Sequence, residues 1–525
     1  SPNSGQKDRA QRMTLDVQTP STSLLPNMIS DLLNHGDPAH IALISPNGPV
    51  LTYGSLKCQV EVLASKLNSF GIGRGDRVAT VLPSGVENIV SFLAVTASGA
   101  TAVPLNPVYT KEEFVFCLED ANAKAIITSS AASDAIKEAI PSQIIDIRVG
   151  INSGGKIRFL NRNKSGFPVA REQVNAEDVA LVLHTSGTTS RPKRVPITHR
   201  NLMVGAKNVA ETYVLTPEDV SLCVMPLFHI HGLVASTLAT LITGGMVVVP
   251  PKFNALDFWQ TVKAQHVTWY TAVPTIHQAL LHRAKRNAGS GAIGVARQNL
   301  RFIRSCSAPF PPEALMEMEE TFGVPVLEAY GMTEATHRVA STPLTGKRVP
   351  GSVGVGAGVS VAIMDTDGNF EPAGVTGEVV IKGDNVTNGY ENNPEANHNC
   401  FTNGWFRTGD QGVMDSDGYL RLVGRLKEII IRSGENISPR EIDETLLAHP
   451  AVTEAVAFAV PNSTHGEEPS AAVVVSGSIK ASELVAFCRE RLAAFKCPKI
   501  IHIVDEIPRT ATGKVQRRMV SAALA

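Results

Sequence analysis

The chain has 525 residues, more than one hydrophobic core usually supports, so its length predicts at least two domains. Its 48 Lys and Arg nearly balance 49 Asp and Glu, giving a formal net charge of -1, which argues against extended contact with nucleic acid or an anionic membrane. The seven cysteines are scattered without a C-x-x-C pair, which favours reduced thiols in the cytoplasm.

Three segments bear on targeting. Residues 1–12 are polar and precede Met13, so we expect a disordered leader and not a signal peptide. The longest apolar run, residues 232–250, is interrupted by two glycines and predicts a helix followed by a buried strand, with a membrane span as the weaker alternative. The final Ala-Leu-Ala does not match the peroxisomal S-K-L signal.

From residue 51 to 128, apolar runs alternate with amphipathic stretches. This alternation predicts an α/β fold with mostly parallel, helix-covered sheets. The expected strands are 78–82, 101–105 and 125–128, and the expected helices are 86–98 and 111–120.

The same alternation resumes after residue 198. Ligands of such sheets bind beyond the carboxyl ends of the strands, so we expect the loops 184–194, 226–232 and 305–309 to converge on one crevice. The expected strands here are 220–226, 246–249, 269–272 and 301–305, and the expected helices are 199–212, 233–242, 255–264 and 276–285.

From Gly351 the chain has short β runs separated by Gly, Asp and Asn, which predict a small β subdomain. After Arg425 the pattern becomes that of a small α+β module. We therefore expect an N-terminal domain at 13–424 and a small, mobile C-terminal domain at 425–525.

A donor-rich loop follows the apolar run 179–183, in the segment LVLHTSGTTSRPKRVPIT at 181–198. Its hydroxyls, glycine and cations suit a polyphosphate held by backbone N–H groups and point charges. The loop is not a Walker A sequence, and such a cluster taken alone is more often a surface turn. The candidate contacts are Thr185, Ser186, Gly187, Thr188, Thr189 and Lys193.

TSGTTSRPK resembles the nucleotide signature of the adenylate-forming superfamily, which includes acyl-CoA synthetases, luciferases and peptide-synthetase adenylation domains. Four further segments resemble motifs of that superfamily and follow in its order. They are EAYGMTEAT at 328–336, WFRTGD at 405–410, GRLKEIIIRSGENISPRE at 424–441 and PRTATGKVQRR at 508–518.

The resemblance implies ATP, Mg²⁺ and CoA as ligands. Glu334 and the Thr188 hydroxyl would hold Mg²⁺, and Lys514 would bridge the substrate carboxylate and the α-phosphate. Without the resemblance, Glu334 reads as a solvated acid and Lys514 as a surface lysine. The other residues that it implies are Glu328, Ala329, Tyr330 (stacked on adenine), Gly331 and Thr333 for the nucleotide, Asp410 and Arg425 for ribose, Ser433, Gly434 and Glu435 for CoA, and Lys427 as the hinge.

Donor-rich segments near this crevice point to a polar acid. A fatty-acid tunnel would be apolar, and burying many donors without an anion is costly, so the pattern favours a small acid with a second carboxylate. The alternative is that the arginines point to solvent. The expected acid-binding residues are His229, His231, Arg304, Ser305 and His337, with Ser307 and Arg338 nearby.

Four segments, WYTAVPTIHQ, LRFIRSCSAP, EAYGMTEATH and NVTNGYENNPEAN, are together similar to the oxalyl-CoA synthetase branch. This similarity implies an AMP-forming oxalate–CoA ligase. The alternatives are a ligase for malonate or for an aryl or fatty acid, a luciferase-like oxygenase, a stand-alone adenylation domain and a non-catalytic relative. Ser190 and Arg194 stand where the superfamily most often has Gly, which puts the loop geometry in doubt. The pattern does not predict the oligomeric state.

Overall fold

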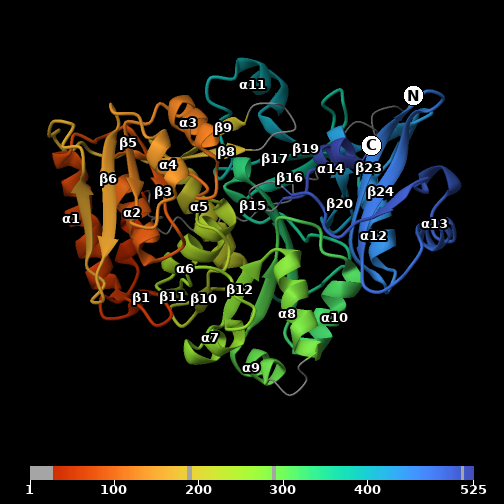
Figure 1. Ribbon diagram of the computed structural model, residues 1–525, viewed down its shortest axis with the longest axis horizontal. Coiled ribbons are helices and arrows are strands. Elements are labelled where there is room, and N and C mark those ends of the chain that lie inside the picture. The colour runs from red at the N-terminus through yellow and green to blue at the C-terminus, as the bar shows by residue number, and fades with distance from the viewer. Residues whose placement is uncertain (1–27, 186–191, 287–290, 510–513, 525) are drawn as a thin grey trace, which may run out of the picture.

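A seven-stranded sheet forms the N-terminal part of the computed structural model, which describes residues 28–185, 192–286, 291–509 and 514–524 (Figure 1). Its inner strands are parallel, and an antiparallel strand closes each edge. In spatial order the strands are β7 (Ile157–Asn161), β6 (Ile145–Ile151), β5 (Ala125–Thr128), β3 (Arg77–Val81), β4 (Thr101–Pro104), β8 (Val179–Thr185) and β9 (Lys193–Thr198).

A second, eight-stranded sheet follows the same plan, with antiparallel strands only at its two edges. Its inner strands are short and almost wholly buried, as parallel strands covered on both faces are. In spatial order the eight strands are β15 (His337–Ser341), β14 (Val326–Met332), β13 (Phe302–Ser305), β12 (Trp269–Ala272), β10 (Val220–Leu222), β11 (Met246–Val248), β1 (Ile41–Ile44) and β2 (Val50–Thr52).

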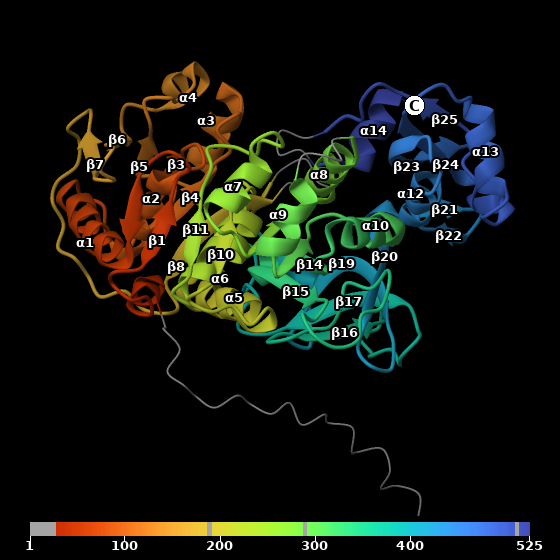
Figure 2. The same cartoon turned by 90° about the horizontal axis from the view of Figure 1, so that it is seen from below.

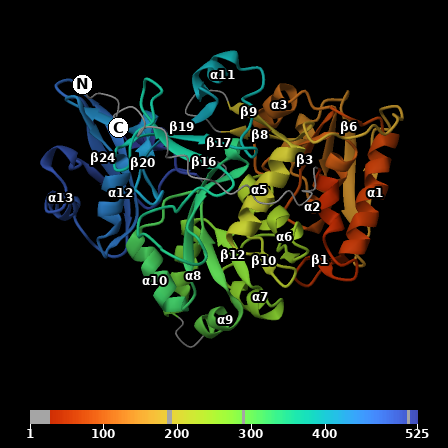
Figure 3. The ribbon, with the colours of Figure 1, turned by 180° about the vertical axis from the view of Figure 1, so that it is seen from behind.

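Helices between the two sheets bury a shared core. α1 (Tyr53–Ser69), α2 (Val86–Ala97) and α5 (His199–Thr212) contribute apolar side chains to one cluster that includes strands of both sheets. α5 begins directly after β9 because the Thr198 side chain accepts the Asn201 backbone N–H while the Asn201 side chain caps Thr198 in return. Figure 3 shows α5 between the two sheets.

Other helices cover the outer faces. α3 (Lys111–Asp120) and α4 (Asp134–Ala139) pack on the seven-stranded sheet, and α7 (Phe258–Ala264), α8 (Pro274–Arg286), α9 (Ala292–Asn299) and α10 (Pro312–Phe322) pack on the eight-stranded sheet. The N-terminal η1 (Ile29–Asn34) and the short α6 (Ala239–Leu241) join the shared core. The layers therefore alternate helices and sheets, as predicted.

The β subdomain and the C-terminal module complete the chain (Figure 2). The subdomain consists of β16 (Ser360–Met364), β17 (Gly377–Lys382), β18 (Phe401–Thr402), β19 (Trp405–Met414) and β20 (Leu420–Arg425), with α11 (Pro394–Cys400) beside it. The module contains η4 (Leu426–Glu428), β21 (Ile430–Arg432), β22 (Glu435–Ile437), α12 (Pro439–Leu447), β23 (Val452–Asn462), β24 (Gly466–Val475), α13 (Ala481–Arg489), η5 (Ala494–Lys496), β25 (Ile501–Ile503) and α14 (Arg517–Leu524).

The C-terminal module has a hydrophobic core of its own, built around Ile430, Ile442, Leu446 and Leu484. The prediction of a large α/β part followed by a small α+β part is therefore confirmed. The division at residues 424 and 425 and the mobility of the module stay predictions.

Two predicted elements differ from the structure. The strand expected at 220–226 ends at Leu222, and the helix expected at 233–242 begins earlier as a π-helical segment, η2 (His231–Leu238), before α6. A Cβ on Gly232 would lie 2.4 Å from the Pro226 carbonyl oxygen, so the close approach of the chain at this bend requires glycine. The bend brings His231 to the carboxyl end of the sheet.

Candidate active site

The predicted phosphate loop joins two antiparallel strands. β8 ends at Thr185 and β9 begins at Lys193, and these residues face each other in the register of the pair. The predicted contacts Ser186, Gly187, Thr188 and Thr189, together with Ser190, lie outside the described residues. The Lys193 ammonium lies 4.6 Å from the centre of the Tyr390 ring, and this cation–π contact holds the charge at the end of the loop.

Glu334 contacts the same tyrosine. It lies in η3 (Thr333–Ala335) directly after β14, and its Oε1 accepts a hydrogen bond of 2.7 Å from the Tyr390 hydroxyl. Tyr390 thus connects Glu334 with Lys193. Its hydroxyl contacts the buried Glu334 carboxylate, and its ring contacts the Lys193 ammonium at the end of the loop. The structure therefore brings the first two motifs together.

The surroundings of Glu334 fit a magnesium site that needs the nucleotide. Mg²⁺ usually takes one or two carboxylate oxygens and fills its other positions with phosphate oxygens and water. The Tyr390 hydrogen bond uses Oε1, which leaves Oε2 for a hard cation. Among the described residues, no group of three or more His, Cys, Asp or Glu side chains could hold a metal ion.

The predicted adenine and ribose residues also meet. The Tyr330 hydroxyl on β14 donates a hydrogen bond to Oδ2 of Asp410, and Arg425 Nε lies 3.8 Å from Oδ1 of the same carboxylate. Asp410 and Arg425 face each other in the register of β19 and β20. Burial raises the pKa of Asp410, and the bond from Tyr330 opposes that shift.

The rest of the second motif lies on the edge of the eight-stranded sheet. Glu328, Ala329 and Gly331 are on β14, and Thr333 begins η3. A Cβ on Gly331 would lie 1.9 Å from the His337 carbonyl oxygen, so only glycine fits there. Burial raises the pKa of Glu328 to about 7, although Arg440 on α12 of the C-terminal module lowers it.

Lys514 reaches this region from the C-terminal module. Part of its side chain stays exposed, but nearby protein atoms desolvate the ammonium and lower its pKa. Arg425 lowers this pKa further, whereas the Glu334 carboxylate raises it. Lys514 also lowers the pKa of His229, so it lies within electrostatic range of both the nucleotide residues and the expected acid pocket.

The expected acid pocket is a buried hydrogen-bond network. Arg304 on β13 is fully buried, and its Nη2 lies 2.7 Å from Nε2 of His337 on β15. The His231 ring, at the start of η2, lies 5.2 Å from the His337 ring. Ser305 is buried, and its hydroxyl is without a hydrogen-bond partner among the described residues. The alternative that Arg304 points to solvent is wrong.

Backbone strain gathers at the same place. Ser307, Thr336 and His337 have φ angles of 71°, 50° and 89°, in the left-handed region that residues other than glycine rarely adopt. Such conformations persist where surrounding contacts fix them, and they are frequent at binding sites. His229 is partly buried beside this cluster, and burial lowers its pKa to about 3.

Two members of the network were not predicted. Tyr213 follows α5 and its hydroxyl accepts a hydrogen bond from Arg304 Nε at 3.0 Å, and Thr271 on β12 accepts one from Arg304 Nη1 at 2.9 Å. The rule that ligands bind at the carboxyl ends of parallel strands would have indicated Thr271, near the end of a predicted strand. Arg338 is buried, but it donates to the Asn208 carbonyl at 3.3 Å and to Ser341 at 2.9 Å, away from this network.

The expected CoA and hinge residues lie in the C-terminal part of the chain. Ser433 and Gly434 form the turn between β21 and β22, Glu435 begins β22, and Lys427 is exposed in η4. In Figure 2 this turn lies on the side of the module away from α14, the helix that follows Lys514. The module therefore carries α14 and the strands that flank the expected CoA loop on different sides.

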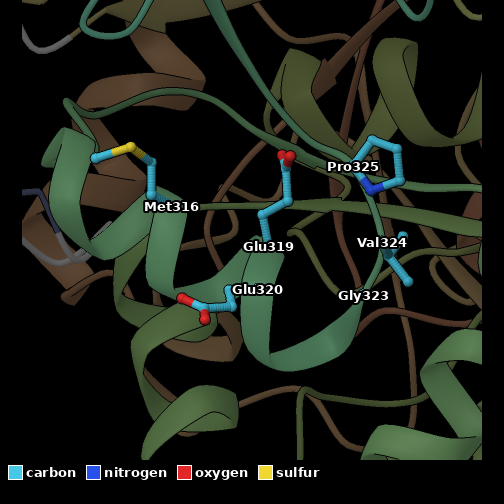
Figure 4. A pocket seen from close by; sticks show the side chains of 6 residues that line it. All are labelled: Met316, Glu319, Glu320, Gly323, Val324 and Pro325. Atoms are coloured by element: carbon cyan, nitrogen blue, oxygen red, sulfur yellow. The ribbon is translucent and has the colours of Figure 1, made fainter.

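A surface cavity of about 430 Å³ lies elsewhere, at the end of α10 (Figure 4). It contains none of the predicted site residues, and its Glu319 carboxylate is paired with Arg348. The cavity is lined by Met316, Glu319, Glu320, Gly323, Val324 and Pro325.

Comparisons with known proteins show which family the chain belongs to. The family of AMP-binding enzymes matches residues 34–391, and the AMP-binding enzyme C-terminal domain matches residues 441–514. The chain is 47% identical to an oxalate–CoA ligase of Arabidopsis thaliana, over 90% of this chain and 93% of that protein. It is 43% identical to an oxalate–CoA ligase of Saccharomyces cerevisiae, over 86% of this chain and 87% of that protein.

The fold is similar to that of ATP-bound MatB from Rhodopseudomonas palustris, with a TM-score of 0.85 and 31% identity over 95% of this chain and 98% of that one. Against the apo form of the same protein the TM-score is 0.75. Because the model of AMP-binding enzymes matches more than half of the chain and the C-terminal domain model matches a further segment, the chain belongs to the family of AMP-binding enzymes.

Proposed function

We propose that the protein is an AMP-forming acid–CoA ligase that converts oxalate, ATP and CoA into oxalyl-CoA, AMP and pyrophosphate. The observation that carries this proposal is the buried network of His231, Arg304 and His337 beside the nucleotide residues. Burying these polar groups beside an apolar acid would cost free energy, whereas the network suits a small acid with a second carboxylate. Oxalate–CoA ligases among the relatives support the same acid.

In the first step a carboxylate oxygen of oxalate attacks the α-phosphorus of ATP, and the bond to the leaving pyrophosphate breaks. Asp410 and Arg425 hold the ribose, and Lys193 and Lys514 place positive charge where the transferred group gains negative charge. Mg²⁺ held by Glu334 and Thr188 would neutralise phosphate charge when bound. The product is an acyl adenylate, so the chain supplies mainly position and charge.

In the second step the CoA thiol attacks the acyl carbon, its proton leaves, and AMP departs. For this step the C-terminal module rotates about Lys427, withdraws Lys514 and brings the loop at Ser433, Gly434 and Glu435 to the site. The position of α14 and of the strands β21 and β22 on different sides of the module supports such a rotation. The influence of the Glu334 carboxylate on the pKa of Lys514 supports a role for this lysine in the first step.

The state of the cysteines bears on the compartment. All seven cysteines are described and free, which supports a reducing compartment, and we propose the cytoplasm. Among the described residues, the structure contains no helix that is long and apolar enough to cross a bilayer.

The test is AMP release with ATP, Mg²⁺ and CoA across oxalate, malonate, acetate, coumarate and a long-chain fatty acid. Turnover confined to oxalate is the expected result. Preference for malonate would keep the ligase chemistry and change the acid, whereas preference for an aryl or fatty acid would contradict the polar pocket. AMP release without CoA consumption would indicate a stand-alone adenylation domain, and oxygen uptake or light would indicate a luciferase-like enzyme.

A further inference from the structure

A chain of four side chains runs from the interior of the protein to the pocket surface. Arg304 Nη1 donates to Thr271 Oγ1 at 2.9 Å, Thr271 Oγ1 lies 2.7 Å from His231 Nε2, and His231 Nδ1 lies 2.9 Å from Ser307 Oγ. Arg304, Thr271 and His231 are buried, whereas Ser307 is exposed. Only the last member of the chain is therefore open to a ligand.

The arginine fixes the direction of every hydrogen bond in the chain. A guanidinium has donors and no acceptor, so Thr271 Oγ1 accepts from Arg304 and its own proton is free for His231 Nε2. His231 then carries its proton on Nδ1 and donates it to Ser307 Oγ. The remaining donor, the Ser307 hydroxyl proton, lies at the exposed end.

The opposite direction is unfavourable. If His231 donated from Nε2, Ser307 would donate to Nδ1, and the Thr271 hydroxyl proton would need another acceptor. The hydrogen bonds among the described residues give Thr271 Oγ1 no such acceptor. A fully buried hydroxyl donor without a partner is costly, so the first direction is favoured.

Both histidines of the network are neutral. Burial lowers the pKa of His231 and of His337, and the Arg304 charge lowers both further. Arg304 Nη2 donates to His337 Nε2, which therefore has no proton there and carries it on Nδ1, beside Gly331. One arginine thus sets the tautomers of both histidines.

We propose that Arg304 and Thr271 are positioning residues that fix the tautomer of His231, so that the Ser307 hydroxyl donates its proton to the second carboxylate of the acid substrate. This inference rests on the proposed function for the identity of the ligand. It makes the pocket selective, because an acid without a second carboxylate offers the Ser307 hydroxyl no charged acceptor and leaves it to water. In this proposal Arg304 acts through its neighbours and not directly on the acid, since three of its five N–H donors point to Tyr213, Thr271 and His337.

The first test reads the tautomer without any substrate. Nitrogen chemical shifts of ¹⁵N-histidine in the full chain distinguish protonation at Nδ1 from protonation at Nε2, and His231→Gln identifies the signal. We expect His231 to be neutral and protonated at Nδ1. Protonation at Nε2, or at both nitrogens, at neutral pH would overturn the proposal, whether or not oxalate is the substrate.

The second test compares Thr271→Val with Thr271→Ser. The valine variant keeps the shape but removes the hydroxyl, so we expect KM for oxalate to rise at least about tenfold while KM for ATP changes less than about twofold. The serine variant should restore oxalate KM. The matched control is Thr240→Val, another buried threonine, whose hydroxyl donates to the Ser236 carbonyl outside the chain of four.

Equal oxalate KM in Thr271→Val and Thr240→Val would overturn the proposed role of Thr271, as would a parallel loss of ATP affinity. If the valine variant does not fold, the histidine shifts of the wild-type enzyme still decide the direction of the chain. If the wild-type enzyme does not turn over oxalate, the proposed substrate is wrong, and the tautomer measurement still tests the hydrogen-bond chain by itself.

Discussion

Arg194 Nε lies 3.1 Å from Oε2 of Glu391, and this ion pair accounts for an arginine where the superfamily most often has glycine. Arg194 Nη1 also lies 3.1 Å from Asp120 Oδ2, and Arg77 donates to both oxygens of Glu391. These residues line a cavity of about 510 Å³ beside β9. The φ angle of Arg194 is not positive, so its backbone conformation does not require glycine at this position.

Arg194→Gly should therefore cost stability and spare catalysis. Removing a partly buried cation leaves Asp120 and Glu391 without one partner, which we expect to lower the free energy of unfolding by about 1–3 kcal/mol. KM for ATP should stay within about threefold. Urea unfolding and AMP-release kinetics measure both effects, and Arg194→Lys is the conservative control. A tenfold rise in KM for ATP would instead place Arg194 at the phosphates.

Lys514→Ala should separate the two half-reactions. The variant loses the positive charge next to Glu334 and Arg425, so adenylate formation from oxalate and ATP should slow by about 100-fold or more. Thioester formation from supplied oxalyl adenylate and CoA should change much less. Single-turnover assays of each half-reaction measure this, and an equal loss in both would exclude the proposed role of Lys514.

Arg517 anchors the segment that carries Lys514. Its guanidinium lies 2.7 Å from Asp443 and 3.2 Å from Glu428, the residue after the expected hinge. Arg517→Ala should therefore misplace Lys514 and slow adenylate formation by about 10- to 100-fold. Arg489→Ala, on the exposed face of α13, is the matched control in the same half-reaction assay. Equal rates in the two variants would contradict this anchoring role.

His337→Ala should discriminate between acids. Because a lost hydrogen bond to a charged group is worth about 1.5–3 kcal/mol, we expect kcat/KM for oxalate to fall about 10- to 100-fold. A monocarboxylate such as acetate, which lacks the second carboxylate, should lose much less. Steady-state kinetics with both acids measure the difference, and an equal loss would remove His337 from the acid site.

His277 should make stability fall in weak acid. It is fully buried with hydrogen bonds to Tyr270 and the Ala272 carbonyl, and burial lowers its pKa from 6.5 to about 4. Between these values the unfolded chain binds more protons than the native one, so the free energy of unfolding decreases as pH falls. The contribution of His277 is about 2 kcal/mol between pH 6.5 and pH 5.

Urea unfolding of the wild-type chain and of His277→Gln at several pH values measures this contribution. The variant should show a shallower pH dependence by about that amount. Burial also lowers the pKa of His199 to about 4, so the free energy of unfolding of the variant still depends on pH in this range. Identical slopes in the two proteins would show that His277 is not held neutral by the fold.

Short contiguous motifs let the sequence determine the fold class and most of the nucleotide site. The alternation of short apolar runs with amphipathic stretches indicates strands and helices that pack against each other. Segments such as EAYGMTEAT carry their donors and acceptors at fixed local spacing. The resemblance of these segments to motifs of the superfamily allowed Tyr330, Asp410 and Arg425 to be named before their contacts were known, and the structure brings them together.

The acid pocket depended on the tertiary structure. The residues next to Arg304 in the sequence do not determine whether its side chain points to solvent or to the interior. The register of β12 and β13 places Thr271 opposite Arg304 and so decides its partner. Tyr213 reaches the same guanidinium from the end of α5, far away in the sequence. Strand register and burial arise from long-range packing, so local residue patterns determine the chemistry available, and the fold decides which groups meet.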